Sequence, residues 1–425
     1  PSINVPPGAK YLQEYLHSFG YRTERYGKTY HGKYEYLFNW DYVEGGNDED
    51  GKHSNNTNKQ NDIAPASSWG IKPGNAQTSI NDFGVTADLV ARLHQPITQP
   101  FFFALGLSTH NAFTPNIQFW NYYGNQAKKV TLPYWEANGS VLGNSSENIV
   151  IPNTPANDRN DIPAIAFTVP DNTVIQPDSS WRKTVQAYYA EVSIMDWNLG
   201  RVLDALDEEN MWDNTVVIFI SDHSQHLGEH GGVWLKNTLF EESLHVPFII
   251  CAPGKAASVC SKLVEIVDIY PTITELCKIP TPTGLEGSSL ARLLDNSNLT
   301  WKRAAFSQVK PGNSYPNGTK GVAVHSENYH YNNWGIYGEE LYNRQNDPNE
   351  YTNLVSNPAY LSVLNQMRTI YQEGWQNSKP PPCDSLLYYK DSDGDGYGIT
   401  DSVFKGCYQP IGYSLNPADC NDAIA

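Results

Sequence analysis

Residues 216–254 read VVIFISDHSQHLGEHGGVWLKNTLFEESLHVPFIICAPG. The first five residues are apolar and mostly β-branched, which predicts a strand buried on both faces of a parallel sheet, and Val246 to Cys251 predict a second apolar strand. In an open α/β sheet, ligands bind beyond the carboxyl ends of the strands. Asp222 and His223 directly follow the first strand, and their carboxylate oxygen and imidazole nitrogen together suit a divalent cation.

The loop between the two strands adds His226, Glu229, His230 and Lys236. Taken alone, an Asp-His pair after a strand is more often a turn-capping Asp with an incidental His. The complete spelling SDHxxHLGEHGxxxK, followed by TLFEE and VPFIICAPG, closely resembles the C-terminal metal-site segment of the sulfatases, in particular the branch that includes iduronate-2-sulfatase. This resemblance implies that Asp222 and His223 bind the active-site calcium and that Lys236 binds the substrate.

The composition is that of a globular protein with a large core, because 40% of the 425 residues are apolar and 12% are aromatic. The formal net charge of −17 argues against a nucleic-acid partner, which requires clustered Lys and Arg. An anionic substrate remains compatible with this charge, because fields decay over about 8 Å at physiological salt. No apolar run approaches the roughly 18 residues that a membrane span requires.

Six cysteines are too few to form a disulfide scaffold in a chain of this length. Cys251 and Cys277 have apolar neighbours in the sequence, which predicts buried thiols. Cys383, Cys407 and Cys420 lie in a polar tail, where a disulfide would imply an oxidising compartment.

Two further segments contribute candidate site residues. Residues 8–20 carry apolar side chains at helical spacing, and a strand and the sequence GKTYH follow them. This order is similar to the sulfatase segment that delivers a Lys and a His to the sulfate pocket, which are Lys28 and His31 here. Residues 100–107 predict another buried strand, and His110 after it matches a sulfate-contacting His of the family, although Thr109 stands where Pro is expected.

Without the resemblance, Lys28 reads as an ordinary surface lysine and His110 as a structural histidine at a strand end. The resemblance instead implies that Lys28 and Lys236 pair with the sulfuryl oxygens. It also implies that His31 and His110 are catalytic and donate to, or exchange protons with, the nucleophile and the substrate.

The expected fold class is α/β, an alkaline-phosphatase-like sandwich with a mostly parallel central sheet flanked by helices. Residues 86–93 and 181–209 predict helices, and a helix followed by the strand at 216 is the alternation typical of a parallel sheet. Residues 44–74 and 116–180 lack periodicity and predict loops. The buried stripe of the long helix is expected to contain Val185, Tyr189, Val192, Leu199, Val202, Leu203 and Leu206.

The domain organisation follows from the same family segments. Residues 263–276, LVEIVDIYPTITEL, resemble one of them, and Pro271 lies just inside the start of a predicted helix. We expect a catalytic domain over residues 1–305, a small C-terminal α+β subdomain over 306–378, a Pro-rich linker over 379–390 and an incomplete calcium-binding repeat over 391–425.

The tail contains the sequence DSDGDGYG over residues 391–398. Alternating carboxylates let several oxygens converge on one hard cation, so Asp391, Asp393 and Asp395 predict a calcium site. An EF-hand is excluded, because Ser402 stands where its twelfth position requires Glu. The spelling resembles the short calcium-binding repeats of secreted bacterial surface proteins and implies a secreted, cell-surface or periplasmic location in a bacterium. A solvated acidic tail is the alternative.

The nucleophile of the sulfatases is a formylglycine made from Cys or Ser within C/S-x-P-x-R, and this chain contains no match. Cys251 begins the nearest sequence, CAPGK, but Lys255 replaces the required Arg. The upstream Asp-Asp metal ligands are also missing, and Pro1 is preceded by no initiator Met. We therefore expect an N-terminally truncated sulfatase whose nucleophile lies upstream, and no catalysis by these 425 residues alone.

The expected function is that of a sulfuric ester hydrolase that removes sulfate from a sulfated carbohydrate in polysaccharide degradation, with a formylglycine-generating enzyme as a partner. A divalent cation together with Lys and His donors would neutralise the charge that repels an incoming nucleophile. Two alternatives stay open. One is a phosphate mono- or diesterase of the same superfamily, and the other is a catalytically inactive, calcium-dependent surface protein.

Overall fold

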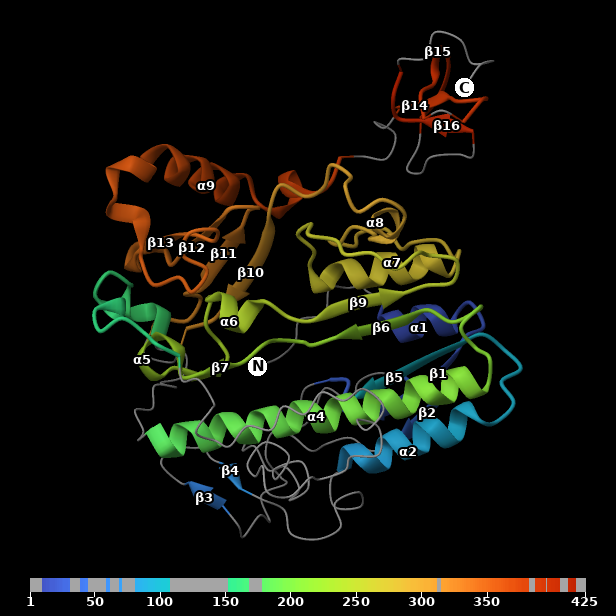
Figure 1. Cartoon of the computed structure of the whole chain (residues 1–425), viewed down its shortest axis with the longest axis horizontal. Helices are drawn as coiled ribbons and strands as arrows, with labels where there is room; N and C mark the ends of the chain where they lie inside the picture. The colour runs from blue at the N-terminus through green and yellow to red at the C-terminus, as the bar shows by residue number, and fades with distance from the viewer. Residues whose placement is uncertain are drawn as a thin grey trace. The chain divides into compact units, whose positions relative to one another are not determined.

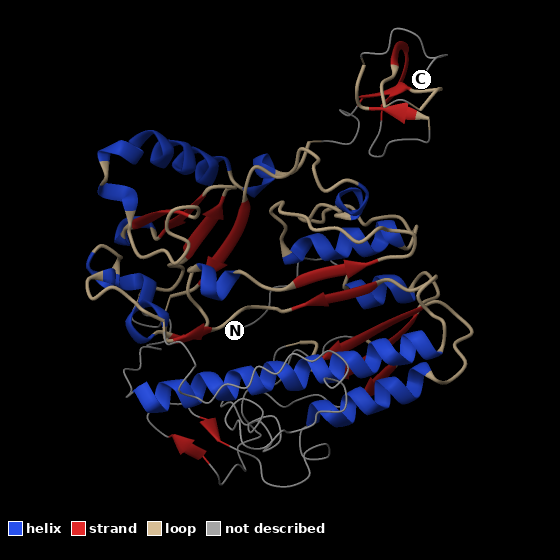
Figure 2. Cartoon of the chain, viewed as in Figure 1, coloured by secondary structure: helices blue, strands red, loops and turns tan. Residues whose placement is uncertain are grey.

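The structure, a computed structural model, describes residues 10–30, 39–44, 59–61, 69–70, 81–107, 152–167, 178–311, 315–381, 387–394, 396–405 and 412–417. The chain divides into two compact units. The first comprises Pro1–Phe248 and Pro311–Asn317, and the second comprises Ile249–Lys310 and Gly318–Ala425. Helices and strands occur in both units (Figures 1 and 2), as expected of a mixed α/β protein.

The first unit contains a parallel sheet with the strand order β2-β1-β5. β1 (Arg22–Gly27) pairs with β2 (Tyr42–Glu44) on one side and with β5 (Phe101–Gly106) on the other. Gly27 lies opposite Gly106 where β1 and β5 end. A Cβ atom at Gly106 would lie 1.5 Å from the carbonyl oxygen of Lys28. The two backbone segments are therefore so close that only glycine fits at position 106.

Three helices belong to the layer around this sheet. α2 (Asn81–Leu93) packs against α4 (Asp178–Glu208) and against β1, and α1 (Leu12–His17) also contacts β1 (Figure 1). Their shared core consists of Tyr26, Val85, Leu89, Leu93, Ala205 and Leu206. All three helices confirm predicted ones, although α2 begins earlier than predicted. No helix in the described parts of the chain, α4 included, is apolar enough over a sufficient length to cross a membrane.

The predicted stripe of α4 is wrong at two positions. Tyr189 and Val192 are exposed, whereas Ala187, Ala190 and Ile194 are fully buried. A stripe chosen by large apolar side chains overlooks alanine, whose small side chain lets neighbouring elements approach a helix closely. The true buried face is therefore displaced from the predicted one.

The remaining elements of the first unit are short. They are β3 (Lys59–Asn61), β4 (Trp69–Gly70), η6 (Asp158–Asn160), η7 (Ala164–Phe167), β6 (Val217–Ile220), β7 (His226–Leu227), α5 (Glu229–Gly232), β8 (Trp234–Leu235) and α6 (Glu241–Leu244). β3 and β4 form an antiparallel pair within the predicted loop 44–74. β6 confirms the strand predicted to precede Ser221, but its side chains are half-buried rather than buried on both faces.

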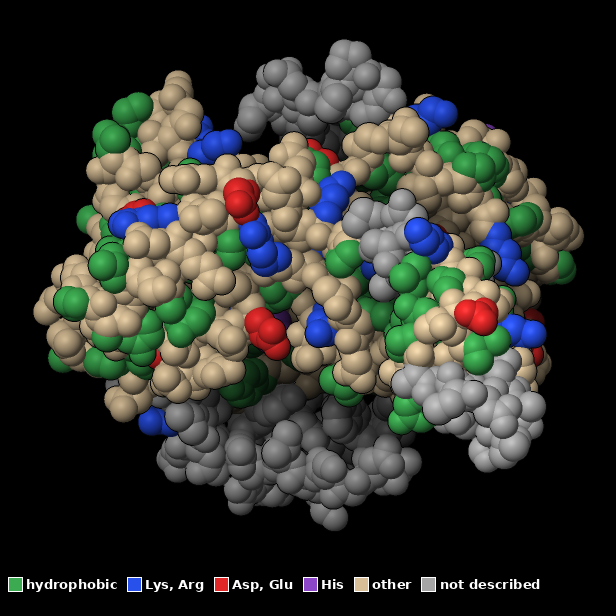
Figure 3. Space-filling view, turned by 90° about the horizontal axis from the view of Figure 1, so that it is seen from above, with side chains coloured by type: hydrophobic (Ala, Val, Ile, Leu, Met, Phe, Trp, Pro, Cys, Tyr) green, Lys and Arg blue, Asp and Glu red, His purple; other side chains and the backbone are tan. Residues whose placement is uncertain are grey.

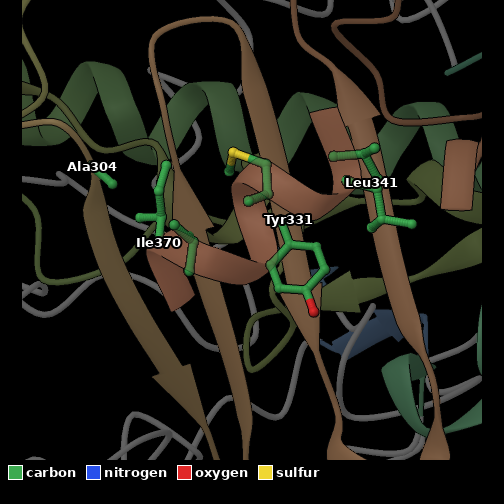
Figure 4. Packing of buried hydrophobic residues seen from close by; sticks show 7 residues of the cluster. Ala304, Tyr331, Leu341 and Ile370 are labelled. Carbon is green, nitrogen blue, oxygen red and sulfur yellow. The ribbon is translucent and has the colours of Figure 1, made fainter. Parts of the chain in front are cut away.

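The second unit contains a four-stranded antiparallel sheet. Its strands, in spatial order, are β10 (Ala305–Val309), β11 (Gly321–His325), β12 (Tyr329–Asn333) and β13 (Glu339–Asn343). Helix α9 (Leu361–Glu373) packs on one face, where the core consists of Ala304, Val324, Tyr331, Leu341, Leu364, Met367 and Ile370 (Figure 4). Val324, Tyr331 and Leu341 are register partners on three adjacent strands, which is why they share this face.

The other elements of the second unit begin with β9 (Phe248–Cys251), whose first residue belongs to the first unit. They continue with η8 (Ile266–Asp268), α7 (Ile269–Leu276), α8 (Ala291–Asp295), η9 (Gly335–Tyr337), η10 (Leu354–Ser356), η11 (Pro358–Tyr360), η12 (Trp375–Ser378), β14 (Leu387–Lys390), β15 (Ile399–Lys405) and β16 (Tyr413–Ser414). Pro271 lies in the first turn of α7, as predicted. The prediction of buried thiols is wrong, because Cys251 is exposed on the short strand β9 and Cys277 is half-buried at the end of α7.

A buried lysine joins three segments of the second unit. Asp268 is fully buried and accepts hydrogen bonds from the backbone N–H groups of Glu265 and Ser288 at 2.8 and 2.7 Å. The Lys302 ammonium lies 2.6 Å from Asp268 Oδ2 and 2.5 Å from Glu265 Oε2. Its side chain is only 3% exposed, so this charge cluster is shielded from water.

Replacement of Lys302 by methionine is expected to lower the free energy of unfolding by about 3 kcal/mol, because it leaves buried carboxylates without their counter-charge. Lys255→Met is the matched control, since Lys255 pairs with the largely exposed Asp295 and such pairs contribute under about 1 kcal/mol. Urea unfolding followed by circular dichroism measures both changes. Equal losses in the two variants would contradict the role assigned to Lys302.

Charges of both signs are distributed over the face of the described residues that Figure 3 shows. Lys and Arg side chains are spread over this face, and Asp and Glu side chains appear at a few places among apolar and uncharged ones. The charges on this face are therefore mixed rather than collected into one patch.

Candidate active site

Asp222 and His223 lie directly after β6, where the sequence predicts metal ligands. The Asp222 side chain is 81% exposed, and its Oδ1 lies 3.7 Å from His223 Nε2. His223 Nδ1 lies 2.9 Å from the carbonyl oxygen of Ser224. A carbonyl only accepts hydrogen bonds, so Nδ1 carries the proton and the Nε2 lone pair lies near Asp222. In this tautomer Nε2 is the ring nitrogen that could bind a metal ion.

Lys236 lies between two residues with strained backbones. It directly follows β8, which pairs with β7 to form a short antiparallel ribbon. Leu235 has φ +66° and Asn237 has φ +72°, and this left-handed conformation is costly for a branched side chain such as that of leucine. Strain of this kind concentrates at functional sites and persists only where the surroundings hold it.

Lys28 follows the last residue of β1, and its backbone N–H donates to the carbonyl of Gly106 at 2.9 Å. Lys28 and Lys236 both affect His223. Burial lowers the pKa of His223 most, and the positive charges of Lys236 and then Lys28 lower it further, against the negative charge of Asp222. The charges of Lys236, Asp222 and Lys28 therefore all act on His223, whose lowered pKa favours the neutral imidazole.

The other predicted site residues are distributed differently. His31 and His110 lie outside the described residues, as does Asp395 of the tail. Asp391 accepts the backbone N–H groups of Gly394 and Gly396 at 2.7 and 3.2 Å, so its carboxylate shapes the loop after β14. Asp391 and Asp393 belong to the same loop, and calcium binding there stays a prediction.

A buried cluster around His230, in the loop between β6 and α6, has no role among the predictions from the sequence. His230 is fully buried, with Nδ1 3.1 Å from Asp158 Oδ2 and Nε2 3.7 Å from Glu242 Oε2. Its ring stacks on Phe240, with a centroid distance of 3.9 Å. The recurrence of histidine at 226 and 230 inside the loop was a visible signal. The partner Asp158 was not, because it belongs to a segment without periodicity.

Two models of known protein families match the chain. The family model described as Sulfatase matches residues 3–279, well over half of the chain. The chain belongs to the sulfatase family. A second model, described as the C-terminal region of N-sulphoglucosamine sulphohydrolase, matches residues 228–376. The sulfatase is thus a member of a family of metal-dependent sulfuric ester hydrolases, as the motif around Asp222 implied.

Similar proteins include a sulfatase of Formosa agariphila, which is 26% identical over 383 residues and covers 85% of this chain and 68% of the relative. Human iduronate 2-sulfatase is 33% identical over 150 residues, which are 29% of this chain and 27% of the human protein. The resemblance to the iduronate-2-sulfatase branch is confirmed in that such enzymes are among its relatives. Against the human enzyme, this sulfatase matches about a quarter of the relative's length.

Solved structures share the fold. A phosphonate monoester hydrolase from Silicibacter pomeroyi superposes with a TM-score of 0.69 at 15% identity, covering 95% of this chain and 85% of the other. A structure described as a complex with its substrate D-glucosamine-2-N,6-O-disulfate has a TM-score of 0.60 at 17% identity and covers 88% and 83%. The expected alkaline-phosphatase-like fold is therefore confirmed.

Proposed function

We propose that this sulfatase hydrolyses sulfate esters of carbohydrates and that Lys28, Asp222, His223 and Lys236 form its sulfate-binding site. The observation that carries the proposal is the pair of Asp222 Oδ1 and His223 Nε2, 3.7 Å apart after β6, and the charges of Lys236 and Lys28 that lower the pKa of His223 support it. Two ammonium groups and a neutral imidazole beside a carboxylate match a site for a cation and a tetrahedral anion. Segments that are distant in the sequence supply these groups.

The donor set fits a divalent cation. Asp222 Oδ1 and His223 Nε2 are 3.7 Å apart, a separation that lets both bind the same ion. A calcium ion held there would supply positive charge to the sulfuryl oxygens. Lys28 and Lys236 would orient the ester and balance the charge that develops on its oxygens. Burial and the charges of Lys236 and Lys28 lower the pKa of His223, so this imidazole would remain available as a ligand at neutral pH.

The remaining parts of the proposed reaction involve residues that the sequence predicts. His31 and His110 would move protons to and from the nucleophile and the substrate. The nucleophile would be a formylglycine contributed outside these 425 residues and produced by a formylglycine-generating enzyme. A secreted or periplasmic bacterial protein with a second calcium ion in its tail loop is compatible with the sequence DSDGDGYG.

A carbohydrate substrate is favoured by the relatives. They include human iduronate 2-sulfatase and an N-acetylglucosamine-6-O-sulfatase of Bacteroides thetaiotaomicron, which is 29% identical over 237 residues. The names of both describe desulfation of a sugar. Sulfated sugars are therefore the first substrates to test.

The test is Asp222→Asn in the protein at its natural length. Sulfate release from sulfated sugars and from an aryl sulfate is expected to fall about 100-fold, because the substitution removes a charged metal ligand. Chelation of the metal should have a similar effect on the unaltered enzyme, and added calcium should restore only the unaltered enzyme.

Asp213→Asn is the control, because Asp213 is an exposed residue that precedes β6 in the same unit. It should leave turnover unchanged. Faster hydrolysis of an aryl phosphate than of the aryl sulfate would favour the phosphatase alternative. Full activity of Asp222→Asn would remove Asp222 from the metal site.

A further inference from the structure

The loop between β6 and α6 contains three of the four residues of the proposed sulfate site, all except Lys28. Asp222 and His223 lie at its beginning and Lys236 near its end, and β7, α5 and β8 lie between them. Any element that fixes the middle of this loop therefore also sets the position of Lys236 relative to His223.

The loop is closed by contacts of its own. β7 pairs with β8, and the carboxylate of Glu229 accepts the backbone N–H of Leu227 at 2.6 Å. At the base, His226 Nε2 lies 2.8 Å from Thr238 Oγ1, which in turn lies 2.8 Å from Ser243 Oγ on α6. These contacts connect the two arms of the loop on both sides of Lys236.

His230 anchors the tip of the loop to the surrounding unit. Its imidazole bridges Asp158 on η6 and Glu242 on α6, and it stacks on Phe240. Its backbone carbonyl accepts a hydrogen bond from Arg159 Nε at 2.7 Å. The residue itself has φ +49°, so this anchoring holds a backbone conformation that a histidine rarely adopts.

The bridge is an ionic one at neutral pH. Burial alone would lower the pKa of His230, but the carboxylates of Asp158 and Glu242 outweigh it and raise the pKa to about 9. The pKa of Glu242 is lowered by the same contact, and by the charge of His226, against its own burial. Among the described residues, Arg159 also donates to the carbonyl of His230, Glu229 precedes it on α5, and the ring of His226 lies 6.1 Å from its ring.

We propose that His230 is a positioning residue, which bridges Asp158 and Glu242 and thereby holds the loop in the form that directs Lys236 to the sulfate. The inference rests on the proposed function only for the identity of the anion. The anchoring of the loop by His230 is a separate claim, and it can be measured without a ligand.

The charge of His230 gives the anchoring a defined pH dependence. Its pKa is about 9 in the folded protein and about 6.5 in an unfolded chain, so the contribution of the bridge is complete below 6.5. It is lost as the pH rises through about 9. The loop is therefore expected to loosen on the alkaline side, below the pH near 10.4 at which ordinary lysines lose their charge.

The experiment uses the full chain and measures the NMR signals of the His230 ring and the Lys236 amide, together with the binding of inorganic sulfate. With histidine labelled in the ring and lysine labelled at the amide, NMR titration reports the midpoint of His230 and the response of the Lys236 amide. The chemical shift of the Lys236 amide is expected to change with pH with the same midpoint as that of the His230 ring. Calorimetry with inorganic sulfate is expected to show at least a tenfold loss of affinity across the same range.

Asp158→Asn and Glu242→Gln test the bridge, because each keeps the shape of the side chain and removes one negative charge. Both midpoints, that of His230 and that of Lys236, are expected to fall together by at least one pH unit, and the loss of sulfate affinity should move with them. A lysine titration could not produce such a shift. Glu209→Gln is the control, since it removes the carboxylate from the exposed His94–Glu209 pair and should move neither midpoint.

Two results would contradict different claims. A Lys236 amide that keeps its midpoint while that of His230 falls in either variant would overturn the positioning role. Absence of sulfate binding by the unaltered chain at pH 7 would contradict the proposed function instead, and the Lys236 amide would still decide the role of His230. Circular dichroism establishes that each variant is folded.

Discussion

Lys236→Ala in the protein at its natural length is expected to lower kcat/KM for a sulfate ester by about 10²–10³-fold, the usual cost of removing one donor that stabilises developing oxyanion charge. The structure gives two reasons for a large effect. The charge of Lys236 is the largest electrostatic contribution to the lowered pKa of His223, so the amine lies near the metal ligand. The left-handed backbone of Leu235 and Asn237 also constrains the segment that carries Lys236.

Steady-state rates of sulfate release measure this change, with circular dichroism to establish that the fold is retained. Lys183→Ala is the matched control, because Lys183 is an exposed lysine on α4 in the same unit. It should change kcat/KM by less than twofold. Lys236→Arg keeps the charge but presents a planar fork instead of a compact ammonium, so partial activity is expected. An alanine variant as active as the unaltered enzyme would remove Lys236 from the site.

Gly106→Ala is expected to destabilise the first unit by at least about 4 kcal/mol, a size that single substitutions reach only through a defined structural fault. The added Cβ atom would lie 1.5 Å from the carbonyl oxygen of Lys28 and 2.9 Å from its backbone nitrogen. Those atoms belong to the backbone, so no side-chain rotation can relieve the overlap. β1 and β5 would have to separate, and Lys28 would move with β1.

Gly84→Ala is the control for this substitution. Gly84 is exposed within α2, and a Cβ atom added there meets nothing within 4 Å. Alanine is better than glycine in a helix by roughly 0.5–1 kcal/mol, so this variant should be more stable than the unaltered chain. Denaturant unfolding should show that the free energy of unfolding falls in Gly106→Ala and rises in Gly84→Ala. A Gly106→Ala variant of normal stability would show that the strands do not meet as described.

The local patterns predicted much of the fold. The helical periodicity of 181–209 and the short apolar runs before Ser221 and Ser108 correspond to α4, β6 and β5. Periodicity also gave the wrong exposure for Tyr189, because it registers large apolar residues and overlooks buried alanines. It could not reveal the short β3–β4 ribbon, whose strands are too brief to show alternation.

Residues of the candidate site could be predicted only where the sequence contains a recognisable motif. The motifs around Lys28 and Asp222 contain charged side chains that both act on the pKa of His223, although no local rule connects the two segments. The bridge at His230 could not be predicted, because its partner Asp158 comes from a segment that has no pattern of its own. The positive φ angle of Leu235 arises from the tertiary structure, so the sequence does not indicate it.

The left-handed leucine before Lys236 brings two opposed contributions to stability. A glycine at position 235 would adopt the same backbone angle without steric cost. It would also lose the packing of the leucine side chain against Val185 and Trp234, so the contacts of a bulky residue offset the cost of its backbone conformation.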